Sequence, residues 1–270
     1  MNGRLYETLN KIGHMPGVVQ LRRRRFDSRF ERGQAISCFR GVYDSYSQAV
    51  AAAPKAVAVG YDNAESANLY RDRLDKVYPS DYPMMMWLQK AFNEGARKVM
   101  DLGGHIGVAY YAYQRLIDFP RDLSWIVNDV PAVIESGRSE ATERDPSGRL
   151  SFSEGFDVAA DADLLFTAGC VQYLEDTLAQ QLAALKRRPR WVLVNLLPLH
   201  ETAEYWTVQS IGTAFCPYRI QRMSTFFADM ERLGYGVLDK WENLEKRCWV
   251  AFDPEHSLDR YYGAALELTR

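Results

Sequence analysis

The chain has 270 residues, and 33 lysine and arginine residues stand against 35 aspartate and glutamate residues, a formal net charge of −2 at pH 7. This balance argues against a protein that binds nucleic acid mainly by neutralising phosphates, and also against a strongly acidic disordered chain. Hydrophobic residues make up 47% of the chain and charged residues 25%, which is typical of a globular protein with one or two domains.

The four cysteines are too far apart in the sequence for a C-x-x-C metal or redox site, so we expect free thiols and no bound metal. The N-terminal segment lacks the apolar stretch of a secretory signal, and the chain has no run of about 18 apolar residues that could span a membrane. These features predict a cytoplasmic protein that does not insert into membranes.

From residue 97 onward, short apolar segments alternate with longer amphipathic ones, a pattern that predicts a parallel sheet flanked by helices. Only a short connection, Glu242–Lys246, separates the last two strand candidates, which therefore predicts an antiparallel hairpin. The strand candidates are Lys98–Leu102, Ser124–Asn128, Leu150–Phe152, Asp163–Thr167, Trp191–Leu196, Gly236–Trp241 and Arg247–Phe252, and the helix candidates are Val108–Ile117, Ala132–Glu143, Tyr173–Lys186 and Met223–Leu233.

Residues 1–96 lack this strand patterning. Met85, Leu88 and Phe92 recur at spacings that place them on one face of a helix. We therefore expect residues 1–96 to form a helical N-terminal cap that packs on an α/β domain over residues 97–270. The arginine run at residues 22–25 is expected to be a solvated helix face, with contact to an acidic ligand as the alternative.

A glycine-rich turn, VMDLGGHIG, follows the first predicted strand at residues 99–107. Gly103, Gly104 and Gly107 allow a tight turn and a close approach of the backbone to a ligand before the next helix. An acid, Asp101, stands two residues before the first glycine, and this order favours an adenosylmethionine site over a dinucleotide site. His105 lies inside the loop, where its side chain either reaches over the ligand or points outward as a cap.

A second acid, Asp129, follows the next predicted strand, where a carboxylate can accept hydrogen bonds from both hydroxyls of a ribose. It lies 129 − 101 = 28 residues after Asp101, compared with about 20 in the dinucleotide fingerprint. An NAD-dependent oxidoreductase is therefore the less favoured alternative. Asp129 can also be the N-cap of the helix that begins in PAVIES, and the two roles can coexist.

Several segments together resemble a bacterial family of class I S-adenosylmethionine-dependent methyltransferases found in surface-polysaccharide and secondary-metabolite gene clusters. The resemblance covers most of the chain and implies an α/β fold, a Rossmann-like class I methyltransferase sheet of seven strands with the last one antiparallel. The Asp-Val-Pro at residues 129–131 is also similar to the Asp-Leu-Pro of small-molecule O-methyltransferases. The segments are FRGVYDSYSQA, GYDNAES, MDLGGHIGVAYYAY, WIVNDVPAVIESG, LLFTAGCVQYLED, VLVNLLPLHE, AFCPYRI and CWVAFDPEHS.

This resemblance implies a binding site for S-adenosylmethionine at the ends of four strands. Asp101, Gly103 and Gly107 are implied to shape the cofactor pocket, and Asp129 is implied to hold the ribose. The other implied contacts are Glu154 or Asp157 beside the adenine, and Ala168, Gly169 and Cys170 on the methyl-donor side, where Gly169 is alternatively only a turn residue.

Methyl transfer depends mainly on positioning, and a base is required only when the acceptor must lose a proton. His200, followed by Glu201, is the first base candidate because it comes just after the fifth predicted strand, at the edge that borders the acceptor pocket in this fold. An unperturbed histidine also titrates close to neutral pH. The alternative is a surface histidine in a loop. His105 is the second candidate.

The segment Trp206–Arg219 is an insertion between the fifth strand and the next helix, and such an excursion is a natural acceptor-binding element. Arg219 can pair with a carboxylate or phosphate of the acceptor, or with an acid of the chain itself. Tyr61, Asp62 and Tyr82 are expected to close over the cofactor as a lid. The residues expected to contact the acceptor are Cys170, Tyr173, Glu201, Gln209, Tyr218 and Arg219.

We therefore expect a methyltransferase that uses S-adenosylmethionine on a small polar acceptor, a sugar or a specialised metabolite, with oxygen as the favoured target. The rival hypothesis is a cofactor-binding protein of the same fold with lost or non-methyl chemistry. Small molecules rather than nucleic acids are the expected partners, and the N-terminal helices could pair two chains into a homodimer as readily as cap a monomer.

Overall fold

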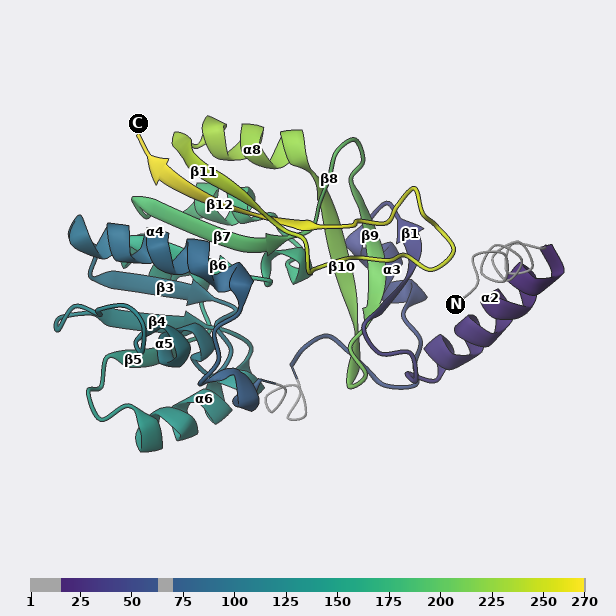
Figure 1. Ribbon diagram of the computed structural model, residues 1–270, viewed down its shortest axis with the longest axis horizontal. Helices are drawn as coiled ribbons and strands as arrows, with labels where there is room; N and C mark the ends of the chain where they lie inside the picture. Colours follow the sequence, from purple (N-terminus) through teal and green to yellow (C-terminus); the bar gives the residue numbers. More distant parts are fainter. Residues whose placement is uncertain (1–15, 63–69, 270) are drawn as a thin grey trace, which may run out of the picture.

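Two β-sheets organise the chain (Figure 1). The computed structural model describes residues 16–62 and 70–269. The larger sheet has seven strands: β3 (Lys98–Leu102), β4 (Ser124–Asn128), β5 (Leu150–Ser153), β6 (Leu164–Ala168), β7 (Trp191–Leu197), β11 (Tyr235–Asn243) and β12 (Tyr261–Leu268). The smaller sheet has five: β1 (Cys38–Tyr43), β2 (Ala58–Val59), β8 (Leu199–His200), β9 (Tyr205–Ser210) and β10 (Ala214–Arg222).

The strands of the larger sheet lie in the order β11-β12-β7-β6-β3-β4-β5. The strands from β3 to β7 pair in parallel, whereas β12 runs antiparallel to both β7 and β11. The expectation of seven strands with the last one antiparallel is therefore confirmed.

Helices cover both faces of the larger sheet, which explains why its central strands are apolar almost throughout. Each strand alternates its side chains between the two faces, so that Val99 joins one core and Met100 the other. The first core includes residues of α4 (Tyr82–Asn93), α5 (Val108–Tyr113) and α6 (Pro131–Arg144), and the second includes residues of η4 (Phe156–Asp161), α7 (Leu178–Ala184) and α8 (Met223–Arg232).

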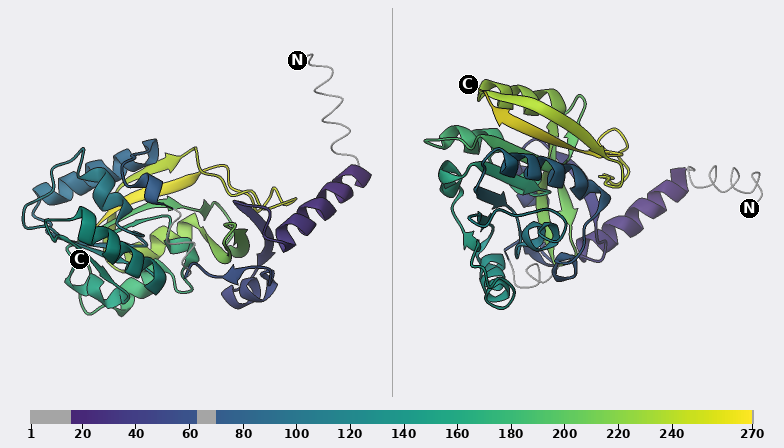
Figure 2. Two further views of the ribbon diagram at one scale, coloured as in Figure 1. Left: turned by 90° about the horizontal axis from the view of Figure 1, so that it is seen from below. Right: turned by 60° about the vertical axis from the view of Figure 1, so that its left-hand side comes forward.

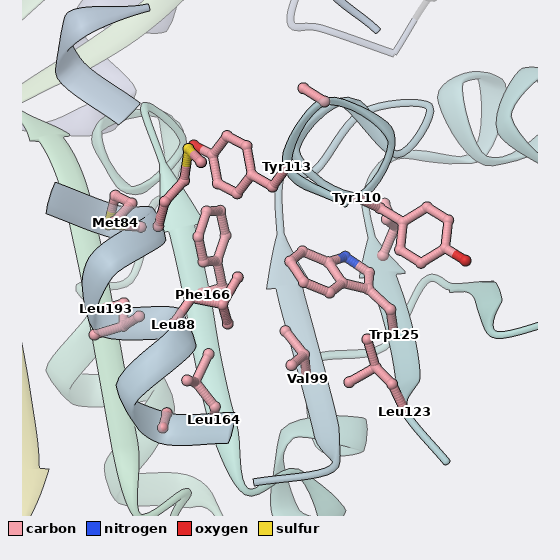
Figure 3. Packing of buried hydrophobic residues seen from close by; sticks show 14 of the residues in the cluster. Met84, Leu88, Val99, Tyr110, Tyr113, Leu123, Trp125, Leu164, Phe166 and Leu193 are labelled. Atoms are coloured by element: carbon pink, nitrogen blue, oxygen red, sulfur yellow. The ribbon is translucent and has the colours of Figure 1, made fainter. Parts of the chain in front are cut away.

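The packing of α4 confirms the expected helix face, because Met85, Leu88 and Phe92 are all buried. Figure 3 shows Leu88 and its neighbour Met84 directed toward the sheet, where Phe166 and other strand residues meet them.

The seventh strand lies later in the chain than predicted. Arg247–Phe252 is not a strand but part of the long loop between β11 and β12, attached by isolated bridges from Cys248 to Leu258 and from Val250 to Phe39. The strand that inserts between β7 and β11 is β12. Both segments alternate apolar residues, and the choice between them depends on contacts with distant strands that a local pattern does not contain. The predicted helix at Tyr173–Lys186 is also shorter, because Thr177 caps α7.

The expected helical cap over residues 1–96 also contains strands, which the sequence pattern did not indicate. The described part contains helices α2 (Pro16–Glu31), α3 (Tyr46–Ala52) and α4, but also β1 and β2. β1 pairs with β9, and β2 pairs with β10, so the smaller sheet takes strands from both sides of the predicted boundary at residue 97. β1 shows no clear alternation because most of its side chains are only half-buried, and its partner lies far along the sequence.

Helix α2 leads away from the body of the molecule (Figure 2). Its end is anchored by Phe30, which is buried against Phe215 with ring centroids 5.1 Å apart. The arginines at positions 22–25 are exposed, as expected for a solvated face. None of the helices over residues 16–62 and 70–269 combines the length and the apolar character that a membrane crossing requires.

We predict that Leu88→Ala lowers the free energy of unfolding by about 2–5 kcal/mol, because it removes a fully buried side chain and leaves a cavity between α4 and the sheet. Met86→Ala, on the exposed face of the same helix, should change it by less than about 0.5 kcal/mol. Urea denaturation of both variants checks this, and equal effects would show that α4 does not pack as described.

Candidate functional site

The strand order of the larger sheet reverses between β3 and β6, so the loops that follow these two strands leave in opposite directions. In open α/β sheets, such a reversal creates a crevice at the carboxyl edge, which is where ligands bind. The glycine loop follows β3, Asp129 follows β4, and residues 168–170 lie at the end of β6. The fold therefore brings these three predicted segments to one edge.

The glycine loop needs glycine because its backbone runs directly against other residues. Gly103 and Gly107 have φ values of 72° and 91°, in the left-handed region that favours glycine. A Cβ atom on Gly103 would lie 2.4 Å from the Cβ of Cys170, and one on Gly104 would lie 2.3 Å from Oδ2 of Asp101. Side chains at these positions would push the loop away from β3 and β6.

Asp101 lies beneath this loop and is 1% exposed. Its Oδ2 accepts a hydrogen bond of 3.1 Å from the indole Nε1 of Trp125. Burial raises the pKa of Asp101 from 3.8 to about 8, against the opposing effect of that hydrogen bond. At neutral pH the carboxyl group is therefore mostly protonated, and a cationic ligand group beside it would favour the carboxylate.

Asp129 is held by the backbone on both sides. Its Oδ2 accepts the N–H of His105 at 2.9 Å, and its Oδ1 accepts the N–H of Val130 at 2.8 Å. Burial raises its pKa to about 6, although the two hydrogen bonds favour the charged form. A carboxylate has about four acceptor positions, so both oxygens can still accept hydroxyl protons.

The alternative role of Asp129 as a helix N-cap is wrong, because Val130 is the N-cap of α6 and its own side chain accepts no hydrogen bond. The side chain that reaches this helix end is that of Asp62, whose Oδ1 accepts the N–H of Ala132 at 3.0 Å.

Aromatic side chains line the space next to the glycine loop. The ring of His105 meets Tyr70 edge-on at 4.9 Å and Tyr61 at 6.4 Å between centroids. Tyr61 lies 6.2 Å from Tyr173, whose hydroxyl donates to Oε1 of Gln209 at 2.7 Å.

Tyr218 packs against Tyr173 at 5.2 Å, so the β9–β10 hairpin reaches this aromatic cluster as the sequence suggested. Tyr70 was not among the expected site residues, since nothing in its sequence context distinguishes it. Tyr82, expected in the lid with Tyr61 and Asp62, is 59% exposed at the start of α4.

The remaining predicted cofactor contacts lie at the carboxyl ends of β5 and β6. Glu154 and Asp157 are exposed, while Ala168, Gly169 and Cys170 are partly buried. Gly169 has a φ of 78° and donates its N–H to the carbonyl of Asn195, so it also serves as a turn residue. Burial raises the pKa of the Cys170 thiol, which keeps it protonated.

The structure argues against His200 as the base. Its Nδ1 accepts backbone N–H groups from Thr202 and Ala203 at 3.1 and 3.0 Å, so Nε2 carries the proton and donates to the carbonyl of Glu255 at 3.1 Å. Both ring nitrogens are therefore used to hold loops. Glu201 is exposed and borders a separate groove of about 390 Å³ beside Trp249, and no described contact joins either residue to the aromatic cluster at the glycine loop.

Arg219 links two segments but keeps unused hydrogen-bond donors, because its Nε and Nη1 are buried without a partner in the described part of the chain. Its Nη2 donates to the carbonyl of Glu175, and its guanidinium lies 4.4 Å from the ring centroid of Trp206. Within the described residues it forms no ion pair, so the expected alternative of pairing with an acid is wrong. Burial lowers its pKa. The hydrogen bond from Arg219 to Glu175 joins β10 to the loop that follows Tyr173.

Five parallel strands, a terminal reversed hairpin, and a glycine loop with two acids at the carboxyl edge define a Rossmann-like methyltransferase fold. The sheet differs from that of the dinucleotide-binding fold, whose strands run parallel up to and including the last one, because β12 runs antiparallel to its neighbours. Across residues 16–62 and 70–269, no three His, Cys, Asp or Glu side chains gather as a metal site.

No protein-family model matches the chain, and no curated protein matches its sequence. Among solved structures, it is similar to the mitomycin 7-O-methyltransferase MmcR, with 18% identity, 67% of this chain and 52% of that chain covered, and a TM-score of 0.42. A 1,6-didemethyltoxoflavin-N1-methyltransferase from Burkholderia thailandensis shows 13% identity over 76% and 83% of the two chains, with a TM-score of 0.47. The N-terminal domain of EvdMO1 shows 12% identity over 72% and 83%, with a TM-score of 0.49. The chain thus spans about half the length of MmcR.

We predict that Asp101→Asn stabilises the ligand-free protein increasingly as pH rises from about 4 to about 8. Over this range the native state holds a proton on Asp101 that the unfolded state has released, so wild-type stability falls with pH by up to about 1.4 kcal/mol per pH unit relative to the variant. Above pH 8 the difference should level off. Urea denaturation at several pH values measures it, with exposed Asp161→Asn as the control; a difference that does not vary with pH would contradict the burial of Asp101.

Proposed function

We propose that this protein is an S-adenosylmethionine-dependent methyltransferase that methylates a small polar acceptor, most favourably at oxygen. The observation that carries the proposal is a pair of acids against one glycine loop, Asp101 buried and Asp129 partly buried, at the point where the strand order reverses. Asp101 lacks a cationic partner among its described contacts, and Asp129 is fixed by two backbone N–H groups. A ligand with an ammonium group and a ribose satisfies both.

The residues at this edge fit the cofactor in its separate parts. Asp129 would accept the ribose hydroxyls, and Asp101 would lie toward the ammonium group of the amino-acid end. Glu154 or Asp157 would border the adenine, and Ala168 and Gly169 the methyl-donor side. S-adenosylmethionine supplies a methyl group on a positively charged sulfur, so the protein has to orient the acceptor and exclude water.

The aromatic cluster that contains Tyr61, Tyr70 and Tyr173, with Gln209 bonded to Tyr173, supports a small acceptor. Ring faces bind flat or apolar surfaces of a ligand, and the amide and hydroxyl groups hydrogen-bond its polar atoms. A sugar or a specialised metabolite with a free hydroxyl group fits this combination. Cys170, neutral and half-buried beside the loop, would add a small contact at the same place.

His105 takes the role of base in this proposal when the acceptor must lose a proton. It lies in the glycine loop, with Tyr61 and Tyr70 against its ring. His200 and His256 instead contact the ring of Tyr205, with ring centroids 6.0 and 4.9 Å away. A neutral imidazole can accept a hydroxyl proton near neutral pH, which neither tyrosine can do.

The proposal extends to a cytoplasmic protein of a bacterial polysaccharide or secondary-metabolite pathway, with no nucleic-acid partner. Exposed helix α2 supports pairing of two chains as readily as a monomer, and light scattering at several concentrations distinguishes the two. A protein of this fold that binds the cofactor without transferring its methyl group is the alternative, favoured only if no acceptor is methylated.

Titration calorimetry with adenosylhomocysteine and with NADH tests the cofactor assignment. We expect adenosylhomocysteine to bind and NADH not to bind. Asp129→Asn should weaken the binding of adenosylhomocysteine by about ten- to a hundredfold above pH 7, because a hydrogen bond to a charged group contributes about 1.5–3 kcal/mol. Exposed Asp161→Asn should bind as the wild type does. Binding of NADH alone would overturn the proposal.

The same titrations give a pH signature for Asp129, whose pKa is about 6. Below pH 6 the wild-type affinity should fall by up to about tenfold per pH unit as the binding carboxylate is protonated. Asp129→Asn should lack this loss, so that the two proteins converge at low pH. The comparison removes the separate contribution of Asp101, which is present in both.

We predict that His105→Gln lowers methyl transfer to a hydroxyl acceptor by about a hundredfold or more while adenosylhomocysteine still binds. The measurement is release of adenosylhomocysteine over a panel of sugars and phenols, with His200→Gln as the matched control that should keep activity. If His200→Gln loses turnover and His105→Gln keeps it over pH 6 to 9, the base assignment is reversed.

A further inference from the structure

A cluster of charged side chains next to the glycine loop holds more positive than negative charge. Arg73 comes from η2 (Arg71–Arg73), Asp81 from η3 (Pro79–Asp81), and Lys246 from the turn after β11. Lys246 is exposed overall, but it lies close enough for the charges of Arg73 and Asp81 to act on it, and partial burial lowers its pKa. Two cations thus lie near one buried acid, Asp81.

The buried side chain of Asn195 connects two of the segments that form this cluster. Its Nδ2 donates to the carbonyl of Ser80 at 2.8 Å, and its Oδ1 accepts Nδ2 of Asn243 at 2.9 Å. The carbonyl of Asn243 in turn accepts the N–H of Lys246 at 3.3 Å. The carboxyl end of β7 therefore places both Asp81 and the turn of Lys246.

Arg73 has hydrogen-bonding capacity that the protein does not use. Its guanidinium lies 4.7 Å from the ring centroid of Tyr78 and 5.4 Å from that of Tyr70. Its Nε is buried without a hydrogen-bond partner, and no carboxylate in the described part of the chain lies within ion-pair distance of it. A buried donor left unpaired destabilises the protein, and an anionic ligand would offset that cost.

Asp81 does not neutralise both cations, because it carries one negative charge and, within the described residues, forms no ion pair with either of them. Its Oδ2 accepts the N–H of Tyr78 at 2.8 Å, and its carboxylate also accepts the hydroxyl of Tyr113. The other nearby acids are Asp72, which pairs with Lys76 at 3.0 Å, and Glu245.

The cluster lies close to Asp101 and to His105 of the glycine loop. Tyr113 is near enough to Asp81, Asp101 and Arg73 for all three charges to act on its hydroxyl. Tyr70, which contacts Arg73, also packs against His105 at 4.9 Å. Arg73 and Asp101 therefore face a common region with opposite preferences, one for an anion and the other for a cation.

We propose that Arg73, assisted by Lys246, is a carboxylate-binding subsite at the carboxyl edge of the sheet. The inference rests on the proposed function. An amino-acid group carries an ammonium and a carboxylate on one carbon, which matches an acid and an arginine that face one region, and the fork of arginine can bind a carboxylate through two hydrogen bonds. A carboxylate on the methyl acceptor is the second possible source.

The test compares adenosylhomocysteine with its decarboxylated analogue, which keeps the adenosine, the thioether and the amine. Arg73→Gln should weaken the binding of adenosylhomocysteine by about ten- to a hundredfold. The affinity for the analogue should stay within about twofold of the wild-type value. Lys246→Gln should have a smaller effect in the same direction. Arg71→Gln is the matched control, because Arg71 stands in the same η2 turn but pairs with Glu140 at 2.6 Å.

The two sources of carboxylate separate in a second titration. Protein saturated with adenosylhomocysteine is titrated with 4-hydroxybenzoate and with glucuronate, in the wild type and in Arg73→Gln. If the variant no longer binds these two ligands but binds adenosylhomocysteine with unchanged affinity, the subsite belongs to the acceptor. If Arg73→Gln changes neither titration, the subsite does not exist.

Failure of the proposed function gives a different result. In that case the wild type binds neither adenosylhomocysteine nor the decarboxylated analogue. Binding of the analogue by Arg73→Gln also demonstrates that the variant is folded, so a loss of adenosylhomocysteine cannot be attributed to unfolding.

Discussion

The contact between the glycine loop and Asp101 is the constraint on which the site depends. The carboxyl group lies on the same face of β3 as Val99, between Trp125 and the backbone of Gly104, and the loop can close only because no side chain intervenes. Closure then brings the N–H of His105 to Asp129 and sets Gly103 against Cys170. One close approach thus aligns the ends of β3, β4 and β6.

That contact has an electrostatic cost, since a carboxyl group is held where its charged form is poorly solvated. Natural sites often retain such a cost where a ligand removes it. Here several such groups lie near one another. They are the carboxyl groups of Asp101 and Asp129, whose pKa values are raised, the unpaired Nε of Arg73, and the neutral tyrosines. This combination supports the proposed ligand, which carries charge of both signs.

Much of the larger sheet could be predicted because its information is local. Continuous apolar strands, the glycine turn and the acids after β3 and β4 depend on neighbouring residues, and the fold places each where the pattern indicated. The smaller sheet, β12 and the structural role of His200 could not be predicted, whereas His105 was named as the second base candidate. β1 pairs with a strand more than 160 residues away, and the two nitrogens of His200 are occupied by backbone groups whose position follows from loop conformation. Tyr70 and Arg73 became site residues only through tertiary contacts.

The pairing of β1 with β9 also bears on how the molecule forms. Contacts between segments so distant in sequence are slow to establish, because the intervening chain must first be brought together. During synthesis the ribosome releases β1 well before β9 exists, so its backbone groups stay unpaired while most of the larger sheet is made, and unpaired strand edges favour aggregation. The aromatic cluster, which takes Tyr218 from β10, can therefore be completed only after the glycine loop and strands β3 to β7 have been synthesised.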